Sequence, residues 1–494
     1  MLDTAGVYVP KFTAIILTAI LTIILYYVVQ SVYRLYFHPL AKYPGPKLAA
    51  ISDLWHVWAL ISERLPFIIS DLHAKYGDVV RIGPNELSFA TSRSYQDIYG
   101  HISKGKGRFL KTDFYDNGDT HKRIVGVQDP EAHARQRKSL SHAFSTKALR
   151  DQEDVVQKYM DLFVQQLAKL GQQGKKDLNM SDVFNWLAFD IIGDLAFGEP
   201  FGAVEDGHAH FWITILLDSI YNSLLTSLRR KMPLMKLVLP YLLPRGADEK
   251  LAKHRVLSRE KARKRIQLGD TGRDDFFSHM LKRATMSEGE MVSQASTLVA
   301  AGSETTATSL CATTWFLLKN PQCMTKLQEE IRGTFTAMDQ ITGNSVSGLQ
   351  YLNGVIEESL RLFPPLAIGL PRYSPGAVVD GHYVPQGTTV SVTPFRMARD
   401  PRYWRDGEAF RPERWINEGF NDDKKATQPF STGPRACLGI NLAYLEMRVI
   451  LAKLSWAYEW ELARPLDDWT RACGMRVLWK KPELWVKYHP RATM

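Results

Sequence analysis

The residue best suited to unusual chemistry is Cys437, within the decapeptide FSTGPRACLG at residues 430–439. Arg435 precedes it by two positions, and its positive charge would favour a deprotonated sulfur. Gly433 and Gly439 let the backbone pass close to a flat ligand and direct amide N–H groups at the sulfur. A cysteine thiolate needs this setting to ligate haem iron, where it donates electron density that favours cleavage of dioxygen. The alternative is a structural cysteine buried in a turn.

A long helical segment carries the second group of reactive side chains. Residues 291–318 are rich in Ala, Leu and Thr, contain no proline and end before Asn320-Pro321, so they predict one helix. The central stretch AAGSETT (300–306) has small side chains that would leave room for a planar cofactor. Glu304 and Thr305 place an acid beside an alcohol, a pair that can relay protons during oxygen activation. The alternative is a surface glutamate on an ordinary helix.

A carboxylate and two arginines predict a charged cluster. Glu358 and Arg361 lie three positions apart on a helix that ends at residues 363–365, so their side chains share one face and can pair. Arg414, within FRPERW, could complete a buried cluster with them. An isolated exposed pair would instead contribute little stability.

Other basic residues are candidates for binding carboxylates. His133 and Arg137 (HARQR) are four positions apart and share one helical face. Haem carries two propionates, and arginine binds carboxylates through its bidentate fork. Arg372, within LPRY, has the same potential. The alternative is a basic helix face in water.

The N-terminal segment predicts a membrane anchor. Residues 12–33 contain no charged side chain and are long enough for one bilayer span of about 20 residues. Aromatic residues follow at the C-terminal end, where an interfacial belt would lie, together with Arg34, Lys42 and Lys47. We therefore expect residues 1–11 on the lumenal side and the large domain in the cytosol. The alternative is a buried core helix.

The remaining sequence predicts one large domain. Residues 34–50 are rich in proline and form a stiff elbow after the anchor. Helical patterns dominate residues 128–335, whereas residues 79–90 predict a β-hairpin and residues 377–392 predict strands and turns. Residues 51–494 are thus expected to form a mostly α-helical domain with small β-sheets.

The segment MPLMKLVLPYLLP (232–244) allows two interpretations. It is apolar, interrupted by proline and flanked by basic residues. A buried connector would have this composition. So would a loop that dips into the membrane and admits a lipophilic substrate, which we slightly favour.

Composition narrows the class of partner. The net charge of +10 favours an acidic partner such as anionic lipid, nucleic acid or an acidic protein. No zinc-finger spacing or RNP-like aromatic motif accompanies the charge, so we do not expect nucleic-acid binding. The four cysteines show no CxxC or disulfide-like spacing, which indicates a reducing compartment.

Together these segments resemble the haem-thiolate monooxygenases of the cytochrome P450 superfamily, over nearly the whole chain after the anchor. The family's oxygen-activation motif corresponds to residues 301–306, and its Glu-x-x-Arg motif to Glu358 and Arg361. By resemblance, Arg414 joins the latter two in a structural triad. The haem-loop pattern is met in full by Phe430, Gly433, Arg435, Cys437 and Gly439.

The resemblance implies a cytochrome P450 fold preceded by one transmembrane helix, with haem as cofactor and Cys437 as the metal ligand. Glu304 and Thr305 become the catalytic pair. The family's propionate-binding arginine is kept as Arg137, and His133, which stands where many microsomal members have tryptophan, can still donate a hydrogen bond there. The implied cofactor-binding residues are His133, Arg137, Arg372, Arg435 and Cys437.

The implied activity is insertion of one oxygen atom of O2 into a hydrophobic small molecule. Cys437 lies close to the C-terminus, which leaves no room after it for a flavin domain. Electrons are therefore expected from a separate NADPH-dependent flavoprotein reductase, and the protein is expected to be a monomer in the endoplasmic reticulum membrane, with its catalytic domain facing the cytosol. The basic residues that could bind the reductase are Arg135, Lys138, Lys424 and Lys425.

Two other functions share this fold. A haem-thiolate isomerase or peroxygenase would need no reductase, but such members tend to lose the acid–alcohol pair present here. A non-catalytic haem-binding protein is the other alternative.

The substrate is predicted only by class. Residues 36–47 and 133–145 are similar to fungal members that tailor secondary metabolites, of the isotrichodermin hydroxylase type. A hydrophobic substrate such as a polyketide or terpenoid would suit the expected pocket, while hydroxylation, epoxidation, desaturation and ring coupling stay open. The residues expected to line that pocket are Phe109, Phe114, Ala300, Ala301, Ile368, Gly369 and Met475.

Overall fold

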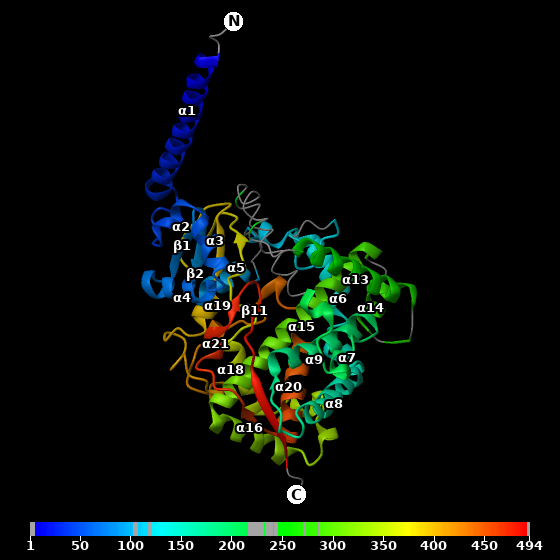
Figure 1. Ribbon diagram of the computed structural model, residues 1–494. Coiled ribbons are helices and arrows are strands. Elements are labelled where there is room, and N and C mark those ends of the chain that lie inside the picture. Colours follow the sequence, from blue (N-terminus) through cyan, green and yellow to red (C-terminus); the bar gives the residue numbers. More distant parts are fainter. Residues whose placement is uncertain are drawn as a thin grey trace.

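A long N-terminal helix stands apart from a body built mainly of helices (Figure 1). The segment 232–244 lies outside the described residues, apart from Met232 and Tyr241, so its contact with a membrane stays a prediction. The computed structural model describes residues 5–101, 107–116, 120–215, 232, 241, 246–269, 272–273, 275–283 and 286–491.

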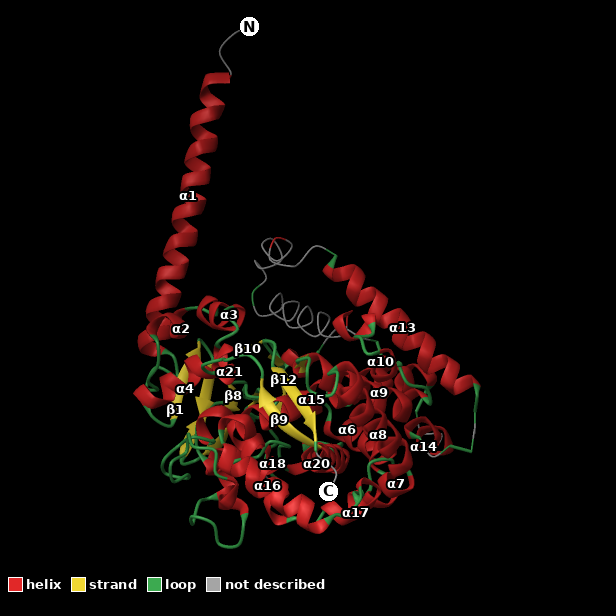
Figure 2. Ribbon diagram, turned by 60° about the horizontal axis from the view of Figure 1, so that its bottom comes forward, coloured by secondary structure: helices red, strands yellow, loops and turns green. Residues whose placement is uncertain are grey.

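Helix α1 (Ala5–Val32) projects from the body as a rod, as both views show (Figures 1 and 2). Residues Thr13–Phe37 are long and apolar enough to cross a membrane, with a mean hydropathy of 2.2 and 0% of the apolar stretch buried in the protein. A core helix would be buried, so that alternative was wrong. The helix is compatible with the predicted membrane anchor.

The elbow after α1 is fixed to the body by partly buried hydrogen bonds from arginine side chains to backbone carbonyls. The chain turns through η1 (Tyr33–Phe37), where Arg34 Nη1 donates to the Ile51 carbonyl at 2.5 Å. Arg81 Nη1 donates in turn to the Arg34 carbonyl at 2.7 Å. A Cβ on Gly45 would lie 2.2 Å from the Arg81 carbonyl oxygen, so only glycine allows this approach.

A five-stranded sheet forms the part of the body nearest the anchor (Figure 1). The predicted hairpin is present as an antiparallel pair of strands. Its second strand also pairs in parallel with a strand that lies about 300 residues later in the chain. In sheet order the strands are β1 (Val79–Gly83), β2 (Glu86–Phe89), β8 (Thr389–Val392), β5 (Arg372–Tyr373) and β3 (Leu110–Lys111). The short helices beside it are α2 (Lys47–Ile51), α3 (Leu54–Ile61), α4 (Leu65–Tyr76), α5 (Ser92–Tyr99) and α19 (Pro394–Met397).

Helices make up most of the remaining body, as Figure 2 shows. They are α6 (Pro130–Ser141), α7 (Thr146–Asp151), α8 (Glu153–Leu170), α9 (Met180–Phe197), α10 (Ala203–Asp206), α13 (Ala247–Gln267), α14 (Phe276–Arg283), α15 (Glu288–Lys319), α16 (Pro321–Thr334), α17 (Gly343–Val346), α18 (Gln350–Leu362), α20 (Ile440–Ala457) and α21 (Trp469–Ala472). Three small sheets pair β4 (Leu178–Asn179) and β9 (Tyr458–Leu462) with β12 (Trp485–Pro490), β10 (Gly474–Met475) with β11 (Trp479–Lys480), and β6 (Ala377–Val379) with β7 (His382–Val384).

The predicted long helix is present as α15 and is slightly longer than expected. It begins with a capping box, in which Glu290 N donates to Ser287 Oγ at 3.3 Å and Ser287 N donates to Glu290 Oε2 at 2.8 Å. Gly302 does not face open space: a Cβ there would lie 2.8 Å from the Ile192 side chain on α9. The glycine therefore allows α15 to pack closely on α9.

The predicted charged cluster forms around the Glu358 carboxylate on α18. Arg361 donates to both carboxylate oxygens at 2.8 Å, Arg414 Nε donates to Oε1 at 3.0 Å, and Trp415 Nε1 donates to Oε2 at 3.0 Å. The three charged side chains are all 0% exposed. Asp422 pairs with Arg414 at 2.6 Å, so two carboxylates balance two arginines.

Replacing Glu358 with Gln tests how much the fold depends on this cluster. The change leaves two buried arginines with one acid, so we expect the free energy of unfolding to fall by about 3–5 kcal/mol in urea titrations. As a control, Arg471→Gln breaks a pair with Asp468 whose side chains are 75% and 43% exposed. It should change the free energy by at most about 1 kcal/mol. Equal effects of the two changes would contradict the prediction.

Candidate active site

The loop that carries Cys437 is closed by its own backbone just before α20. Cys437 N donates to the Phe430 carbonyl at 2.8 Å, and Ala436 N donates to the Gly433 carbonyl at 3.1 Å. Gly433 has a φ of +71°, and a Cβ there would lie 2.2 Å from the Tyr99 carbonyl oxygen. Only glycine satisfies both conditions, so the loop path is fixed by sequence.

The Cys437 side chain is exposed, whereas Cys311, Cys323 and Cys473 are buried. Even so, the surrounding protein raises the pKa of Cys437 by desolvation, partly offset by the Gly439 N–H and the charge of Arg137. The thiol is thus exposed and yet desolvated by the surrounding protein, so a ligand can reach it, and we call the space beside the sulfur the recess. The protein alone thus favours the thiol, and a metal cation in the recess would favour the thiolate.

Arg435 does not act as the sequence suggested. Its guanidinium turns away from Cys437 and donates to the Val127 and Gln128 carbonyls at 2.6 and 2.7 Å. The prediction that its charge favours the thiolate was wrong, since Arg137 supplies the positive charge that lowers the pKa of Cys437. Arg137 is held nearby by a 2.7 Å bond to the Ala436 carbonyl.

Basic side chains gather near the cysteine loop and outnumber the acids described around them. Burial and the charges of Arg435 and Lys111 lower the pKa of His133 to about 3. Burial and the charge of Arg372 lower the pKa of Arg435 to about 10. No carboxylate forms an ion pair with this group in the described part of the chain. The group consists of Lys111, His133, Arg137, Arg372 and Arg435, and we call it the basic cluster.

Lys111 was missed by the sequence analysis. It lies on the two-residue strand β3, where it is paired in register with Arg372 of β5. Burial and the charges of Arg372 and Arg435 lower the pKa of Lys111 well below its usual value. No motif marks it, because only the pairing of β3 with β5 brings it here. The basic cluster has the charge and geometry to bind two carboxylates, which fits the propionates of haem.

Glu304 and Thr305 are adjacent in sequence but make different contacts. Thr305 is partly exposed beside the exposed Ala301, to whose carbonyl its hydroxyl donates at 2.6 Å. Glu304 is only 3% exposed and forms an ion pair with Lys481, which the sequence analysis did not identify. Thr308 Oγ1 donates to the same carboxylate at 3.3 Å. The alternative of a surface glutamate was therefore wrong.

Helix α15 packs against α20, which begins just after Cys437. Thr306 of α15 forms a hydrogen bond with Glu446 of α20, and burial raises the pKa of Glu446 to about 8. The cysteine loop therefore leads into a helix that packs on α15. We call the face of α15 with the exposed Ala301 and the partly exposed Thr305 its open side.

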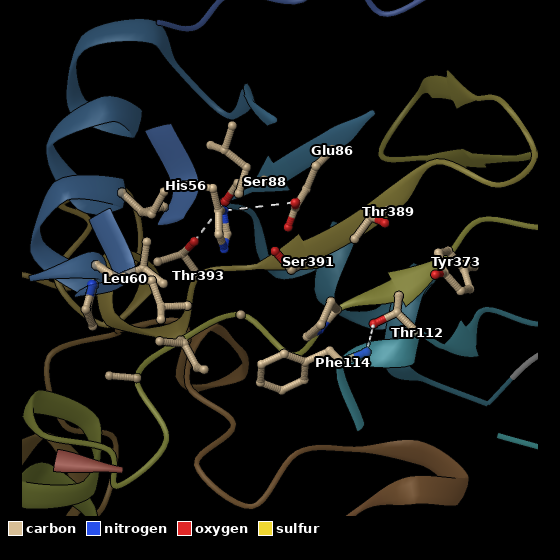
Figure 3. Close-up of a pocket in the computed structure, with 18 of the residues that line it drawn as sticks. His56, Leu60, Glu86, Ser88, Thr112, Phe114, Tyr373, Thr389, Ser391 and Thr393 are labelled. Carbon is tan, nitrogen blue, oxygen red and sulfur yellow. Dashed lines mark hydrogen bonds and ion pairs between the residues drawn. The ribbon is translucent and has the colours of Figure 1, made fainter. Parts of the chain in front are cut away.

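A cavity of about 260 Å³ lies between α3, the β1–β2 hairpin and the segment after α18 (Figure 3). Of the predicted pocket residues, Phe114, Ile368 and Gly369 line it. Phe109, Ala300, Ala301 and Met475 are not among its lining residues. The prediction therefore identified one wall of this cavity.

The opposite wall is polar, which the sequence did not indicate. His56 Nδ1 lies 4.0 Å from a Glu86 carboxylate oxygen, a contact drawn as a dashed line in Figure 3 that becomes an ion pair when the imidazole is protonated. The hydroxyls of Thr389 and Ser391 come from β8 on the same side. The cavity thus combines an aromatic and aliphatic wall with a charged and hydroxylated one.

Comparison with known proteins agrees with this arrangement. The family model for cytochrome P450 matches residues 44–488. The chain is 44% identical to cytochrome P450 monooxygenase BOA3 of Botryotinia fuckeliana, across 93% of each protein. It is 41% identical to monooxygenase btcC of Colletotrichum orbiculare, across 94% of this chain and 92% of the relative. A third relative, monooxygenase poxC of Penicillium oxalicum, is 39% identical across 94% and 92%.

A family match of this extent, together with an exposed cysteine beside a cluster of basic side chains, has one consistent explanation: the chain belongs to the cytochrome P450 family of haem-thiolate monooxygenases.

Proposed function

We propose that Cys437 is the thiolate ligand of haem iron in this protein and that the enzyme oxidises a hydrophobic small molecule. The observation that carries the proposal is the exposure of Cys437 in a recess, while the three other cysteines are buried. A metal at this sulfur removes the desolvation cost of the thiolate. The membrane-compatible α1 helix supports a location at the endoplasmic reticulum membrane, with the body in the cytosol.

The basic cluster would bind the two haem propionates. Its arginines are already oriented by backbone carbonyls or by Tyr115, whose hydroxyl accepts from Arg372 at 2.7 Å. His133 is buried on α6 and is proposed as a further donor in place of the tryptophan of many relatives. Two carboxylates placed here would offset the mutual repulsion of the cations.

Haem supplies the activation of dioxygen when it is bound, and the overall reaction is RH + O2 + 2 e⁻ + 2 H⁺ → ROH + H2O. The chain itself must then bind substrate and deliver two protons. The Thr305 hydroxyl lies on the open side of α15 and can pass a proton there. Glu304, one residue before it, is the proposed acid.

Electrons are proposed to come from a separate NADPH-dependent reductase. Arg135 and Lys138 are exposed on α6, the helix that also carries Arg137 of the basic cluster. Lys425 is exposed and Lys424 partly exposed in the segment leading to the cysteine loop. These positive side chains are suited to an acidic partner surface.

The substrate is proposed to be a polyketide or terpenoid that carries oxygen atoms. Phe114 and Ile368 suit a carbon skeleton, whereas Glu86, Thr389 and Ser391 suit hydroxyl or carbonyl groups at one end. The similarity to fungal cytochrome P450 monooxygenases supports a substrate from fungal secondary metabolism.

Replacing Cys437 with Ala tests the ligand assignment. The reduced carbon monoxide complex of the wild-type enzyme should show the Soret band near about 450 nm that thiolate ligation produces. The variant should lose this band in absorption spectra. Cys323→Ala, a change at a buried cysteine, should keep it. A band that survived the Cys437 change would show that another residue ligates the iron.

Replacing Thr305 with Ala tests the proton relay. In a reconstituted system with NADPH and reductase but no substrate, oxygen consumption can end in hydrogen peroxide or in water. Loss of the hydroxyl should raise the share of oxygen released as peroxide several-fold, measured by peroxide and NADPH assays. Thr305→Ser, which keeps the hydroxyl, should behave like the wild type. An unchanged share in the alanine variant would exclude Thr305 from the relay.

A further inference from the structure

A buried ion pair joins α15 to the C-terminal part of the chain. Lys481 lies between β11 and β12, and its ammonium group contacts the Glu304 carboxylate. The same group donates to Thr308 Oγ1 at 3.2 Å. Both charged side chains are only 4% exposed. With so little solvent around them, the two charges attract strongly and fix one another's position.

The backbone next to Lys481 is held in place. The Pro482 carbonyl accepts from Ser181 Oγ at 2.7 Å and from Trp469 Nε1 at 3.1 Å. These bonds tie the lysine's segment to α9 and to α21. If the Glu304 carboxylate moves, the lysine backbone cannot follow, so the contact must open.

Glu304 lies beside the open side of α15. Successive residues of an α-helix turn by about 100°, so the side chains of Glu304 and Thr305 diverge from one another. Ala301 is exposed and Thr305 partly exposed, while Glu304 is covered. The Glu304 side chain would therefore have to rotate about its own bonds to reach the Thr305 hydroxyl. Its ion pair with Lys481 opposes that rotation.

The other titratable groups around this pair provide no positive charge. Asp182 and Glu483 are acids; burial raises the pKa of Asp182, and the charge of Glu483 adds to the rise, while Asn179 and the charge of Lys481 partly offset it. Burial raises the pKa of Cys311 to about 12 and also raises that of Cys473, so both thiols are neutral near pH 7. None of these four groups could replace Lys481 as the partner of an ionised Glu304.

We propose that Lys481 is a positioning residue that keeps the Glu304 carboxylate paired with its ammonium group, and turned away from Thr305, until a proton arrives. A proton taken up by the carboxylate ends its attraction to the ammonium group and frees the carboxyl to rotate. Glu304 can then give this proton to the Thr305 hydroxyl as that hydroxyl passes its own into the recess. The carboxylate, ionised again, returns to Lys481. This inference rests on the proposed relay.

Replacing Lys481 with Met removes the charge and keeps the length of the side chain. A buried carboxyl without a counter-charge favours its neutral form. Infrared spectra compared in H2O and D2O near pH 7 should therefore show one more protonated carboxyl band than the wild type. The band should disappear in the Lys481→Met/Glu304→Gln double variant. Glu446, which also has a raised pKa, is present in every protein compared, so its signal cancels.

The second readout is the fate of oxygen in the substrate-free system with NADPH and reductase. Without Lys481 to stabilise the carboxylate that each proton transfer leaves behind, Glu304 gives up its proton less readily, so the peroxide share should rise several-fold in Lys481→Met. Lys481→Arg should restore the wild-type share. Lys480→Met is the matched control, because Lys480 is the adjacent residue and its side chain is 59% exposed. It should change neither the infrared band nor the peroxide share.

A Lys481→Met variant without the new band, or with the band but a wild-type peroxide share, would overturn the inference. If this variant does not load haem, Lys481→Gln removes the same charge and carries the same expectations. A response to Thr305→Ala without a response at Lys481 would refute only the positioning role. Unchanged signals in both Cys437→Ala and Thr305→Ala would instead refute the proposed function.

Discussion

The arrangement of the site depends on the buried hydrogen bonds and ion pairs that the Glu358 carboxylate accepts. It accepts from two arginines and a tryptophan with no solvent around it, and so joins α18 to the segment that leads toward the cysteine loop. A buried ion pair contributes little net stability once desolvation is counted, but it strongly disfavours any other geometry. Its main effect here is to fix where residues 410–422 lie, and thus where the chain enters the loop of Cys437.

Three buried charged groups differ in their balance of charge, and the difference matches three roles. Around Glu358, two acids and two arginines satisfy each other, which suits a permanent structural joint. Glu304 is paired with one cation, Lys481. A neutral Glu304 would no longer attract that cation, which suits the proposed contact that opens. The basic cluster forms no ion pair with a carboxylate among the described residues, which suits a ligand that carries carboxylates. Charge balance thus distinguishes the structural Glu358 cluster from the Glu304–Lys481 pair proposed for proton transfer and from the basic cluster proposed for cofactor binding.

Local patterns could be predicted from the sequence, whereas contacts between distant segments could not. Helix α15, the β1–β2 hairpin and the Glu358 cluster follow from periodicity, turns and a three-residue spacing. Lys481 meets Glu304 across 177 positions of the chain, and no residue near either one signals the meeting. Arg435 shows the same limit: its place in the loop was evident, but the direction of its guanidinium depends on carbonyls 307 and 308 residues away.

The anchor and the cavity are mechanically connected. Arg81 on β1 holds the elbow after α1 through the Arg34 carbonyl, and Arg34 holds the end of α2. The paired strand β2 carries Glu86, which lines the polar wall of the cavity. A tilt of α1 in a membrane would therefore be transmitted to the hairpin rather than absorbed by a flexible linker. The polar wall of the cavity thus lies on the strands that are joined to the elbow after α1.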